Sequence, residues 1–272
     1  MIKLDTNLLK QVEDIALAAG KEILRVYGQT GEIETSYKDD HSPLTIADRR
    51  AHDLIENELT KRTPEIPVIS EESQSVDYDL RKSWKQFWLV DPLDGTKEFL
   101  KRNGEFTVNI ALIEDCRPVL GVVYAPALAS LYSAVKGAGA FVSDSKGRRA
   151  IRTADYRQGG LVIAASRSHS DKKLADFLAA VQPVRLLSVG SALKICLVAE
   201  GSAHLYPRFG PTMEWDTGAA HCVLAEAGGT LRTLSGETLA YNRKDMLNPG
   251  FFACGSPPFP WQEYLSETPD AS

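Results

Sequence analysis

Between residues 66 and 142 the chain carries a succession of short apolar runs separated by turn residues, with few helical patterns among them. Short runs of this kind, bounded by turns, are typical of buried strands. Consecutive strands without intervening helices favour an antiparallel sheet over repeated βαβ units. The expected strands lie at 66–69, 87–90, 107–113, 121–124, 131–135 and 140–142.

Two amphipathic helices are expected before these strands. Apolar residues from Leu8 to Ile23 recur at spacings of three and four, which predicts one helix with a single apolar stripe. A second helix is expected to begin after Thr45, with Thr45 as its cap and Asp48 at its third position. The first half is therefore predicted to combine a sheet with packed helices.

The second half alternates strands with helices. The expected elements are strands at 161–165 and 186–189 and helices at 171–181, 192–200 and 215–227. The polar stretch 148–160 separates the two patterns. We therefore predict an N-terminal α+β half at 1–155 and a C-terminal α/β half at 156–272.

Charge and cysteine content exclude several classes of protein. The 272 residues include 36 acidic and 31 basic ones, for a formal net charge of −5. A protein that coats nucleic-acid polymers needs a broad basic face, so that class is not expected. The four cysteines form no CxxC pair, which argues against a zinc ribbon. They are interpreted as four partly buried thiols in a reducing compartment.

No targeting or membrane-spanning segment is predicted. Acidic and basic residues interrupt the first twenty positions, so no signal peptide is expected there. Residues 118–135 carry no charge, but their prolines and glycine fit two buried strands better than a spanning helix. We expect a cytoplasmic location and leave open a peripheral attachment to the cytoplasmic face of the inner membrane.

The sequence WLVDPLDGT at 88–96 places two carboxylates, Asp91 and Asp94, at the end of a buried strand. Gly95 and Thr96 then lead into a short helix expected at 97–101. Hard divalent cations prefer carboxylate and carbonyl oxygens, and a helix N-terminus attracts phosphate. One short loop could therefore hold both a metal and a phosphate. An Asp-Pro turn followed by an Asp-Gly turn is the alternative.

Three further acidic sites stand at the ends of expected elements. Glu71 follows the strand at 66–69, Asp48 lies in the first turn of the second helix, and Asp216 opens the helix at 215–227. Each taken alone fits a solvated loop end or a helix cap. Four acidic sites, each beside an apolar element, instead favour a common metal site.

Other motifs carry less weight. The glycines at 137–139 lack the third glycine of a dinucleotide fingerprint and predict a hairpin turn. The polar stretch 166–169, which includes His169, follows a strand and could line a ligand cleft. Lys194 and Arg208 could contact a second anionic group, although a solvated side chain is the favoured interpretation for each taken alone.

Residues 91–96, with Glu71 before them and Asp216 after them, resemble the inositol monophosphatase superfamily of magnesium-dependent, lithium-sensitive phosphatases. The resemblance runs from about 45 to 229. Stretches 40–48, 94–99 and 206–216 are more similar to its 3'(2'),5'-bisphosphate nucleotidase branch. The resemblance implies a layered α/β/α/β/α sandwich with the active site between the two halves. Leu44 and Gly218 are mild departures, and neither touches an implied ligand.

The resemblance implies removal of the 3'-phosphate of adenosine 3',5'-bisphosphate (PAP), giving AMP and phosphate, in sulfur assimilation and nucleotide recycling. Action on the related phosphosulfate (PAPS) stays open. About two or three Mg²⁺ ions are implied as cofactor. Their implied ligands are Glu71, Asp91, the Leu93 carbonyl, Asp94 and Asp216. Asp48, Glu71 and Thr96 would orient and deprotonate a water nucleophile. The implied substrate contacts are Glu71, Leu93, Asp94, Gly95, Thr96, His169, Lys194, Arg208, Glu214 and Asp216.

Two alternatives stay open at this point. One is an inositol or sugar phosphate phosphatase of the same superfamily, and the other is an inactive sensor that binds metal and nucleotide. Only the nucleotidase hypothesis predicts dependence on a 5'-phosphate. The expected partner is a small nucleotide, not a nucleic-acid polymer, and the oligomeric state is left open.

Overall fold

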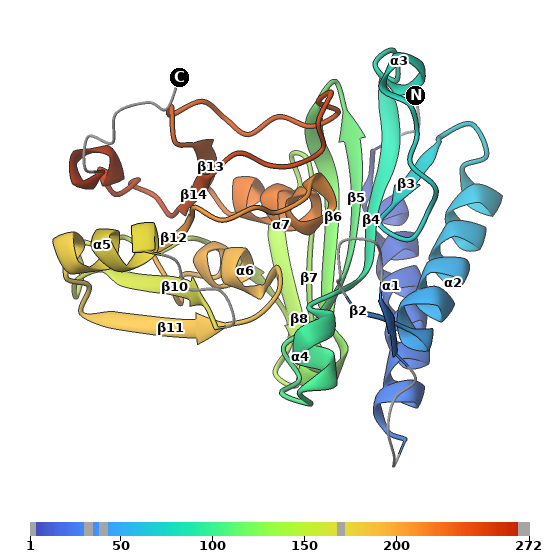
Figure 1. Ribbon diagram of the computed structural model, residues 1–272, viewed down its shortest axis with the longest axis horizontal. Helices are drawn as coiled ribbons and strands as arrows, with labels where there is room; N and C mark the ends of the chain where they lie inside the picture. The colour runs from blue at the N-terminus through green and yellow to red at the C-terminus, as the bar shows by residue number, and fades with distance from the viewer. Residues whose placement is uncertain (1–3, 30–34, 38–42, 168–171, 266–272) are drawn as a thin grey trace.

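The computed structural model describes residues 4–29, 35–37, 43–167 and 172–265, and they form five layers (Figure 1). The order is helix, sheet, helix, sheet, helix, which confirms the expected layered sandwich. The helices of the layers are α1 (Thr6–Tyr27) with α2 (Ile46–Arg62), then α6 (Leu193–Ala199) with α7 (Glu214–Glu226), and finally α5 (Lys172–Val181) with the short 3-10 helix η2 (Trp261–Tyr264).

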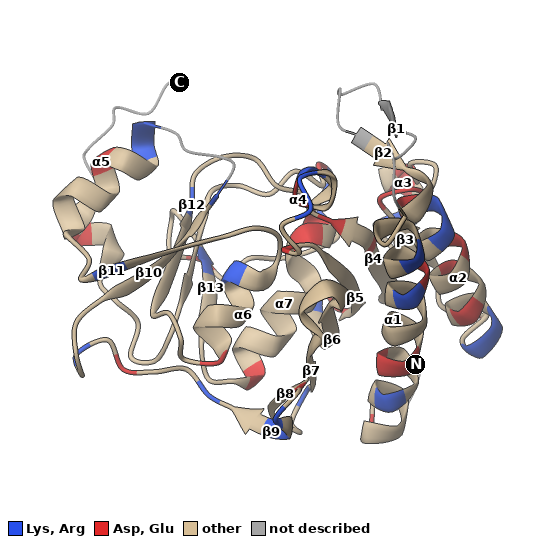
Figure 2. Cartoon of the chain, turned by 90° about the horizontal axis from the view of Figure 1, so that it is seen from below, with Lys and Arg blue, Asp and Glu red and all other residues tan. Residues whose placement is uncertain are grey.

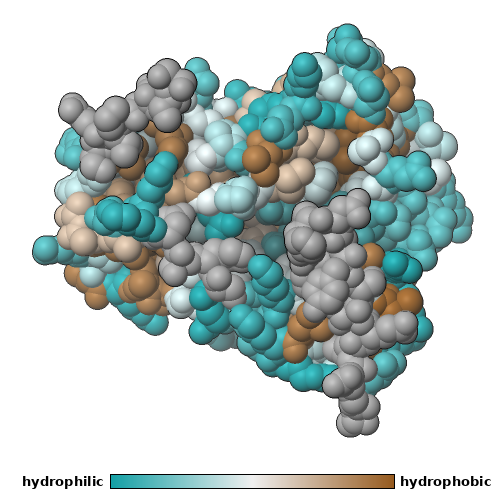
Figure 3. Space-filling model, viewed as in Figure 1, coloured by the Kyte–Doolittle hydropathy of each residue, from teal (hydrophilic) through white to brown (hydrophobic). Residues whose placement is uncertain are grey.

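The two N-terminal helices begin at the caps that the sequence provides. The Asp5 carboxylate accepts hydrogen bonds from two N–H groups in the first turn of α1. Thr45 and Asp48 form a reciprocal capping box at the start of α2. Lys and Arg alternate with Asp and Glu along α2 (Figure 2), and its outer face is hydrophilic (Figure 3, right). Both helices bury their apolar stripes against the first sheet.

The first sheet has seven strands that follow one another in space in chain order. They are β3 (Val68–Ser70), β4 (Gln86–Asp94), β5 (Thr107–Glu114), β6 (Arg117–Ala125), β7 (Ser130–Val135), β8 (Ala140–Asp144) and β9 (Gly147–Ile151). β4 to β9 pair antiparallel, as expected. β3 pairs parallel with β4, which corrects the expectation of a purely antiparallel sheet. The connection 71–85, which contains α3 (Tyr78–Arg81), returns the chain to the same end of the sheet, as a parallel pair requires.

Strand β9 was not expected, because it lies in the polar stretch 148–160. Its residues from Gly147 to Ala150 are exposed, so no apolar pattern marks it. It is the edge strand beside β8, where polar residues are tolerated. The two prolines of 118–135 lie in β6 and in the 3-10 helix η1 (Pro126–Leu128) that follows it, so two buried strands fill that stretch as expected. The division at 155/156 stays a prediction.

The second sheet has five strands in the order β11-β10-β12-β14-β13. They are β11 (Arg185–Val189), β10 (Val162–Ser166), β12 (Leu205–Arg208), β14 (Phe251–Cys254) and β13 (Thr230–Thr233). β10 pairs parallel with both β11 and β12. Since α6 follows β11 and α7 follows β12, both helices of the middle layer begin at the carboxyl ends of parallel strands. A separate two-stranded sheet joins β1 (Thr35–Tyr37) and β2 (Pro43–Thr45).

Helix α7 packs directly on the first sheet at small residues. A Cβ on Gly121 of β6 would lie 2.2 Å from the carbonyl oxygen of Ala219, so only glycine allows this approach. A Cβ on Gly218 would meet Leu89 at 3.1 Å and Ala111 at 3.3 Å, which explains the glycine there. Close packing of this kind fixes the start of α7 relative to the end of β4.

Three of the four cysteines, Cys196, Cys222 and Cys254, are buried free thiols, whereas Cys116 is exposed and so departs from the expected burial. Cys116 lies in the tight turn between β5 and β6, at a positive φ of 61°. Among the described residues, no helix is long and apolar enough to cross a membrane.

Candidate active site

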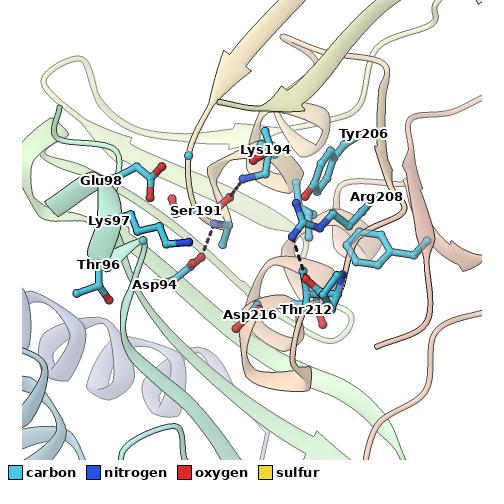
Figure 4. Close-up of a pocket in the computed structure, with 18 residues that line it drawn as sticks. Asp94, Thr96, Lys97, Glu98, Ser191, Lys194, Tyr206, Arg208, Thr212 and Asp216 are labelled. Carbon is cyan, nitrogen blue, oxygen red and sulfur yellow. Dashed lines mark hydrogen bonds between the residues drawn. The ribbon is translucent and has the colours of Figure 1, made fainter. Parts of the chain in front are cut away.

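A cavity of about 270 Å³ lies between the first sheet and the carboxyl ends of β10, β11 and β12 (Figure 4). Ser166, Gly190 and Arg208 line it at those strand ends. The short helix α4 (Thr96–Leu100) and the start of α7 form the opposite wall. In open α/β sheets, ligands bind at the carboxyl ends of the strands, so this is where a ligand site is expected. Figure 2 shows acidic residues gathered beside α4.

The first wall is acidic and is built at the end of β4. The register of β4 against β5 shifts between Asp91, which lies opposite Asn109, and Asp94, which lies opposite Thr107. Such a bulge re-aims side chains at the end of a strand. Gly95 then takes a left-handed φ of 92° at the N-cap of α4, where it offers no side chain to cap the helix. The chain therefore presents Asp94 at the mouth of the cavity with a helix N-terminus beside it.

Four carboxylates of the predicted site lie close enough to perturb one another. Burial, and then the charges of Glu71, Asp94 and Asp216, raise the pKa of Asp91 well above its usual value. The side chain of Glu71 also hydrogen-bonds to Asp91. Burial and the charge of Asp94 raise the pKa of Asp216 well above its usual value too. The structure thus brings together all four acidic residues that the sequence analysis selected as ligands.

The pKa of Asp94 is raised to about 6, mainly by burial. The charge of Lys194, the N–H of Ala192 and the amide of Asn109 oppose that rise. The Asp94 Oδ2 accepts from the Ala192 N–H at 2.6 Å and from Asn109 Nδ2 at 3.4 Å. Asp94 is therefore a carboxylate that joins the end of β4 to the second half of the chain.

The donor set fits a hard divalent cation. It consists of carboxylates and the Leu93 carbonyl, which is the oxygen-only set that Mg²⁺ prefers. Within the described residues, the buried Asn109 Oδ1 beside this cluster has no hydrogen-bond partner, so the region holds more acceptor oxygens than donors. A bound cation would supply positive charge that these oxygens lack.

In this conformation, no three acidic, histidine or cysteine side chains of the described ranges form a chelating cluster. The reason lies in their backbone partners. Asp94 Oδ2 accepts from the Ala192 N–H at 2.6 Å, Asp216 Oδ2 from the Met213 N–H at 2.9 Å, and Asp91 Oδ1 from the Leu93 N–H at 3.0 Å. Repulsion between buried like charges favours such separate partners.

Thr96 and Asp48 meet at the edge of the acidic wall. The Thr96 hydroxyl lies 3.4 Å from Asp48 Oδ1 and 3.3 Å from the Leu93 carbonyl oxygen. The other Asp48 oxygen accepts from the Thr45 N–H at 2.8 Å and from its hydroxyl at 2.6 Å. Burial outweighs these hydrogen bonds and raises the pKa of Asp48 to about 6. The capping box of α2 thus holds a carboxylate against the Thr96 hydroxyl.

The second wall is basic and includes Lys194 and Arg208 (Figure 4). Lys194 is only 6% exposed, so the interpretation as a solvated side chain is wrong for it. Its Nζ donates to the Ser191 carbonyl at 2.6 Å and lies 5.4 Å from the centre of the Tyr206 ring. Burial lowers its pKa to about 8. Arg208 is half-buried, and its guanidinium donates to the carbonyls of Gly210 at 3.1 Å and Pro211 at 2.9 Å.

Three described residues that were predicted to contact substrate, Glu71, Leu93 and Glu214, do not line this cavity. Glu214 is fully buried, and its carboxylate accepts from the N–H groups of Asn242 at 2.8 Å and Arg243 at 3.0 Å. Those bonds occupy the oxygens with which Glu214 was predicted to contact substrate. His169 lies outside the described residues. Ser166, from the same polar stretch, does line the cavity.

Sequence analysis missed the turn Gly190–Ala192 and the side chains of Lys97, Glu98, Tyr206 and Thr212, all of which contribute to the lining. The sequence does contain a pattern that could have predicted a ligand contact at this turn. Gly190 follows an expected strand directly and Ala192 opens an expected helix, which is where an α/β unit places ligand contacts.

The chain is similar in sequence to proteins of a known family. The family model described as "Inositol monophosphatase family" matches residues 5–264. The CysQ 3'(2'),5'-bisphosphate nucleotidases of Salmonella typhimurium and Escherichia coli K12 are each 49% identical over 245 residues, covering 90% of this chain and 98% of theirs. That of Haemophilus influenzae is 36% identical over 266 residues, covering 96% and 98%.

Solved structures of other proteins have a similar fold. The crystal structure of CysQ from Bacteroides thetaiotaomicron is similar with a TM-score of 0.81 at 41% identity, covering 92% of this chain and 97% of that one. That of SuhB from Bartonella henselae has a TM-score of 0.82 at 28% identity, covering 96% and 99%. With a family match over almost its whole length, this chain belongs to the inositol monophosphatase family, whose members are metal-dependent phosphatases.

Proposed function

We propose that this protein hydrolyses the 3'-phosphate of adenosine 3',5'-bisphosphate, giving AMP and phosphate. The observation that carries the proposal is the pairing of the two walls in one cavity. Asp94 and Asp216 face Lys194 and Arg208 across it. The acidic wall is suited to a metal and the phosphate to be cleaved, and the basic wall to a second phosphate. Relatives at 49% identity named bisphosphate nucleotidases support this substrate class.

In this proposal, Glu71, Asp91, Asp94, Asp216 and the Leu93 carbonyl hold Mg²⁺. The bound cation supplies positive charge that stabilises the developing negative charge on the phosphate oxygens. The N-terminus of α4, at Gly95 and Thr96, directs backbone N–H groups and its positive end toward the same phosphate. The proposal also includes the identity of the metal, Mg²⁺, and the number of ions, which is about two or three.

Thr96 and Asp48 would manage the proton of the attacking water. The Thr96 hydroxyl accepts a hydrogen bond from that water while donating its own proton to Asp48 Oδ1, which lies 3.4 Å away. With a pKa of about 6, Asp48 is mostly ionised at pH 7 and yet basic enough to take up a proton. Glu71, beside Asp91, would complete this set as predicted from the sequence.

Lys194 and Arg208 would bind the 5'-phosphate. Both present positive charge to the cavity, and Lys194 is held there by Ser191 and the Tyr206 ring. A charge-assisted hydrogen bond from either one to phosphate is about twice as strong as a neutral one. Glu214 has no part in this proposal because its oxygens are bound by the 242–243 backbone. A role for His169 stays a prediction.

The cellular assignment is also proposed. Buried free thiols at Cys196, Cys222 and Cys254 support a reducing compartment, which favours the cytoplasm. Peripheral attachment to the inner membrane is the alternative. The reaction would serve sulfur assimilation and nucleotide recycling, with PAPS as a second substrate.

The test is phosphate release in the presence of Mg²⁺ from four compounds. They are adenosine 3',5'-bisphosphate, adenosine 3'-monophosphate, AMP and inositol 1-phosphate. We expect the bisphosphate to be preferred, with activity lost on chelation and reduced by lithium. The 3'-monophosphate is the matched control, since it differs from the bisphosphate only in the 5'-phosphate.

Equal turnover of the 3'-monophosphate would contradict the role of the basic wall. Better turnover of inositol 1-phosphate would keep the metal site and overturn the nucleotide substrate. Absence of release from all four compounds would favour the inactive sensor.

A further inference from the structure

One carboxylate joins the two halves beside the candidate active site without belonging to either wall. Glu105 lies in the segment between α4 and β5. Its Oε2 accepts from Arg167 Nε at 2.9 Å and from the Gly190 N–H at 2.9 Å, and its Oε1 accepts from an Arg167 Nη at 2.7 Å. The same Nη donates to the Ser188 carbonyl at 2.5 Å. Glu105 therefore holds the chain just after β10 and just after β11 together.

The turn that Glu105 holds is tightly fitted. A Cβ on Gly190 would lie 2.6 Å from Glu98 Cγ and 2.9 Å from the Glu105 carbonyl oxygen, so the backbone approaches the first half closely there. Ser191 has a positive φ of 51°, a left-handed conformation that is unfavourable for a residue other than glycine. A turn in this conformation persists only where its surroundings hold it.

The turn contacts both walls of the cavity. The Ala192 N–H donates to Asp94 of the acidic wall at 2.6 Å. The Ser191 carbonyl accepts from Lys194 of the basic wall at 2.6 Å. A displacement of Gly190–Ala192 would therefore move the Lys194 ammonium and release Asp94 at the same time.

We infer that Glu105 is a positioning residue for substrate binding, because it clamps the Gly190–Ala192 turn and so sets the spacing between the acidic and basic walls. This inference rests on the proposed function for its substrate. A substrate that bridges both walls with two phosphates depends on that spacing. Binding should therefore suffer more than the chemical step when the clamp is lost.

Most of the stabilisation of the Gly190–Ala192 turn is expected to come from the hydrogen bond that the Glu105 carboxylate accepts from the Gly190 N–H. The ion pair between Glu105 and Arg167 is expected to contribute less. Arg167 has a side chain that is 47% exposed, and exposed ion pairs contribute little. Glu105 is only 16% exposed at its side chain, and it also accepts the Gly190 N–H. Loss of Glu105 should therefore be more harmful than loss of Arg167.

The experiment compares Glu105→Ala, Glu105→Gln, Arg167→Ala and the double variant Glu105→Arg with Arg167→Glu. The readouts are KM and kcat for adenosine 3',5'-bisphosphate, amide hydrogen exchange at 190–195, and Tm. The matched control is Glu13→Ala, since Glu13 is a buried carboxylate 2.6 Å from Arg148 that joins α1 to β9, away from the cavity. Glu13 also accepts from the Ser133 hydroxyl at 2.7 Å.

For Glu105→Ala we expect KM to rise about tenfold to a hundredfold, the range expected for losing a hydrogen bond to a charged group, with a smaller fall in kcat. Exchange at 190–195 should become faster. Arg167→Ala should have a smaller effect, and Glu105→Gln, which keeps one acceptor for the Gly190 N–H, an intermediate one. The double variant restores the charge pair but not that acceptor, so it should not recover KM. Glu13→Ala should lower Tm and leave KM unchanged.

Two outcomes would overturn the inference. One is a fall in Tm for Glu105→Ala with KM and exchange at 190–195 unchanged, as for Glu13→Ala. The other is full recovery in the double variant, which would make the ion pair alone responsible. Hydrogen exchange needs no substrate, so it decides the clamp even if the wild-type protein releases no phosphate from the bisphosphate and the proposed function fails.

Discussion

The two walls of the cavity are built in opposite ways. The acidic wall comes largely from one continuous segment, in which a strand, a bulge and the first turn of α4 follow one another between Asp91 and Thr96. The basic wall is assembled from the ends of separate strands, with Gly190 after β11, Lys194 in α6 and Arg208 at the end of β12. The first is a local structure, and the second exists only when the fold is complete.

This difference bears on what each wall does. A local motif keeps its geometry whatever is attached elsewhere, so it suits the chemistry of phosphate cleavage. Strand ends can change their side chains without disturbing the sheet, so they suit substrate selection. Substitutions in the acidic wall are therefore expected to lower kcat, and substitutions in the basic wall to change KM and substrate preference.

The largest effect is expected in the acidic wall. Asp94→Asn should lower kcat by about 10³-fold or more, since removing even one preorganised electrostatic group costs 10²–10³-fold. Thermal stability without metal should not fall. Burial of the Asp94 charge is costly, and asparagine removes that cost while keeping an oxygen for the Ala192 N–H, which offsets the lost attraction to Lys194.

The measurement is kcat with saturating Mg²⁺, beside Tm in chelator. Asp144→Asn is the control, because Asp144 is paired with Arg149 on β8 and β9 away from the cavity. Near-normal turnover by Asp94→Asn would show that the acidic wall is not the site of chemistry.

The next effect concerns the proton path. Thr96→Val removes the hydroxyl that lies 3.4 Å from Asp48 and should lower kcat by about 10²-fold, the lower end of what general acid–base groups contribute. KM should change little, because the basic wall is untouched. Thr96→Ser keeps the hydroxyl and serves as control. Near wild-type kcat in Thr96→Val, which keeps the methyl group and lacks only the hydroxyl, would contradict the proton role.

A smaller and more selective effect is expected in the basic wall. Arg208→Gln should raise KM for adenosine 3',5'-bisphosphate by about tenfold, as expected for losing one charge-assisted hydrogen bond. The 3'-monophosphate should be hydrolysed as before, since it carries no 5'-phosphate to lose. The ratio of kcat/KM for the two substrates measures this directly. An unchanged ratio would remove Arg208 from substrate selection and leave Lys194 and Lys97 as the other cations that line the cavity.

The same contrast explains how much the sequence could predict. The capping box of Thr45 and Asp48, the strand ending at Asp94 and the short helix after Gly95 depend on neighbouring residues, and each was predicted from them. Strand β9 was missed because an exposed edge strand needs no apolar face. Local patterns therefore predicted many of the helices and strands and the acidic wall, whereas the layered arrangement was implied by the family resemblance.

Residues whose environment is made by distant segments were harder to place. Burial of Lys194 depends on Tyr206 and on the Asp94 loop, neither of which is near it in the sequence. Glu214 was grouped with Asp216, yet residues two apart on a helix point to different sides. Asp216 faces the cavity, whereas Glu214 binds the backbone at 242–243. The turn at 190–192 contributes to the site because the Ala192 N–H donates to Asp94, and these two residues are far apart in the sequence.

The smallest effect on catalysis is expected from His221, which belongs to neither wall. Replacing it tests whether the core around α7 affects the activity of the two walls. His221 is buried in α7, and its Nδ1 lies 2.9 Å from the Tyr241 hydroxyl oxygen. Burial lowers its pKa to about 3, against an ordinary value of about 6.5 in the unfolded chain. Above pH 6.5 both states are neutral at this residue, and its contribution to stability is fully present.

As pH falls below 6.5, the unfolded state binds a proton that the folded state does not. The free energy of unfolding should then drop by up to about 1.4 kcal/mol per pH unit from this residue, until the pH approaches 3. His221→Gln should lose that part of the slope while keeping kcat at pH 7, since α7 still presents Asp216 at its start. Urea unfolding of both proteins at pH 7, 6 and 5 measures the slopes. Equal slopes would mean that His221 is not neutral in the fold, and a large loss of kcat would mean that the core of α7 sets the acidic wall after all.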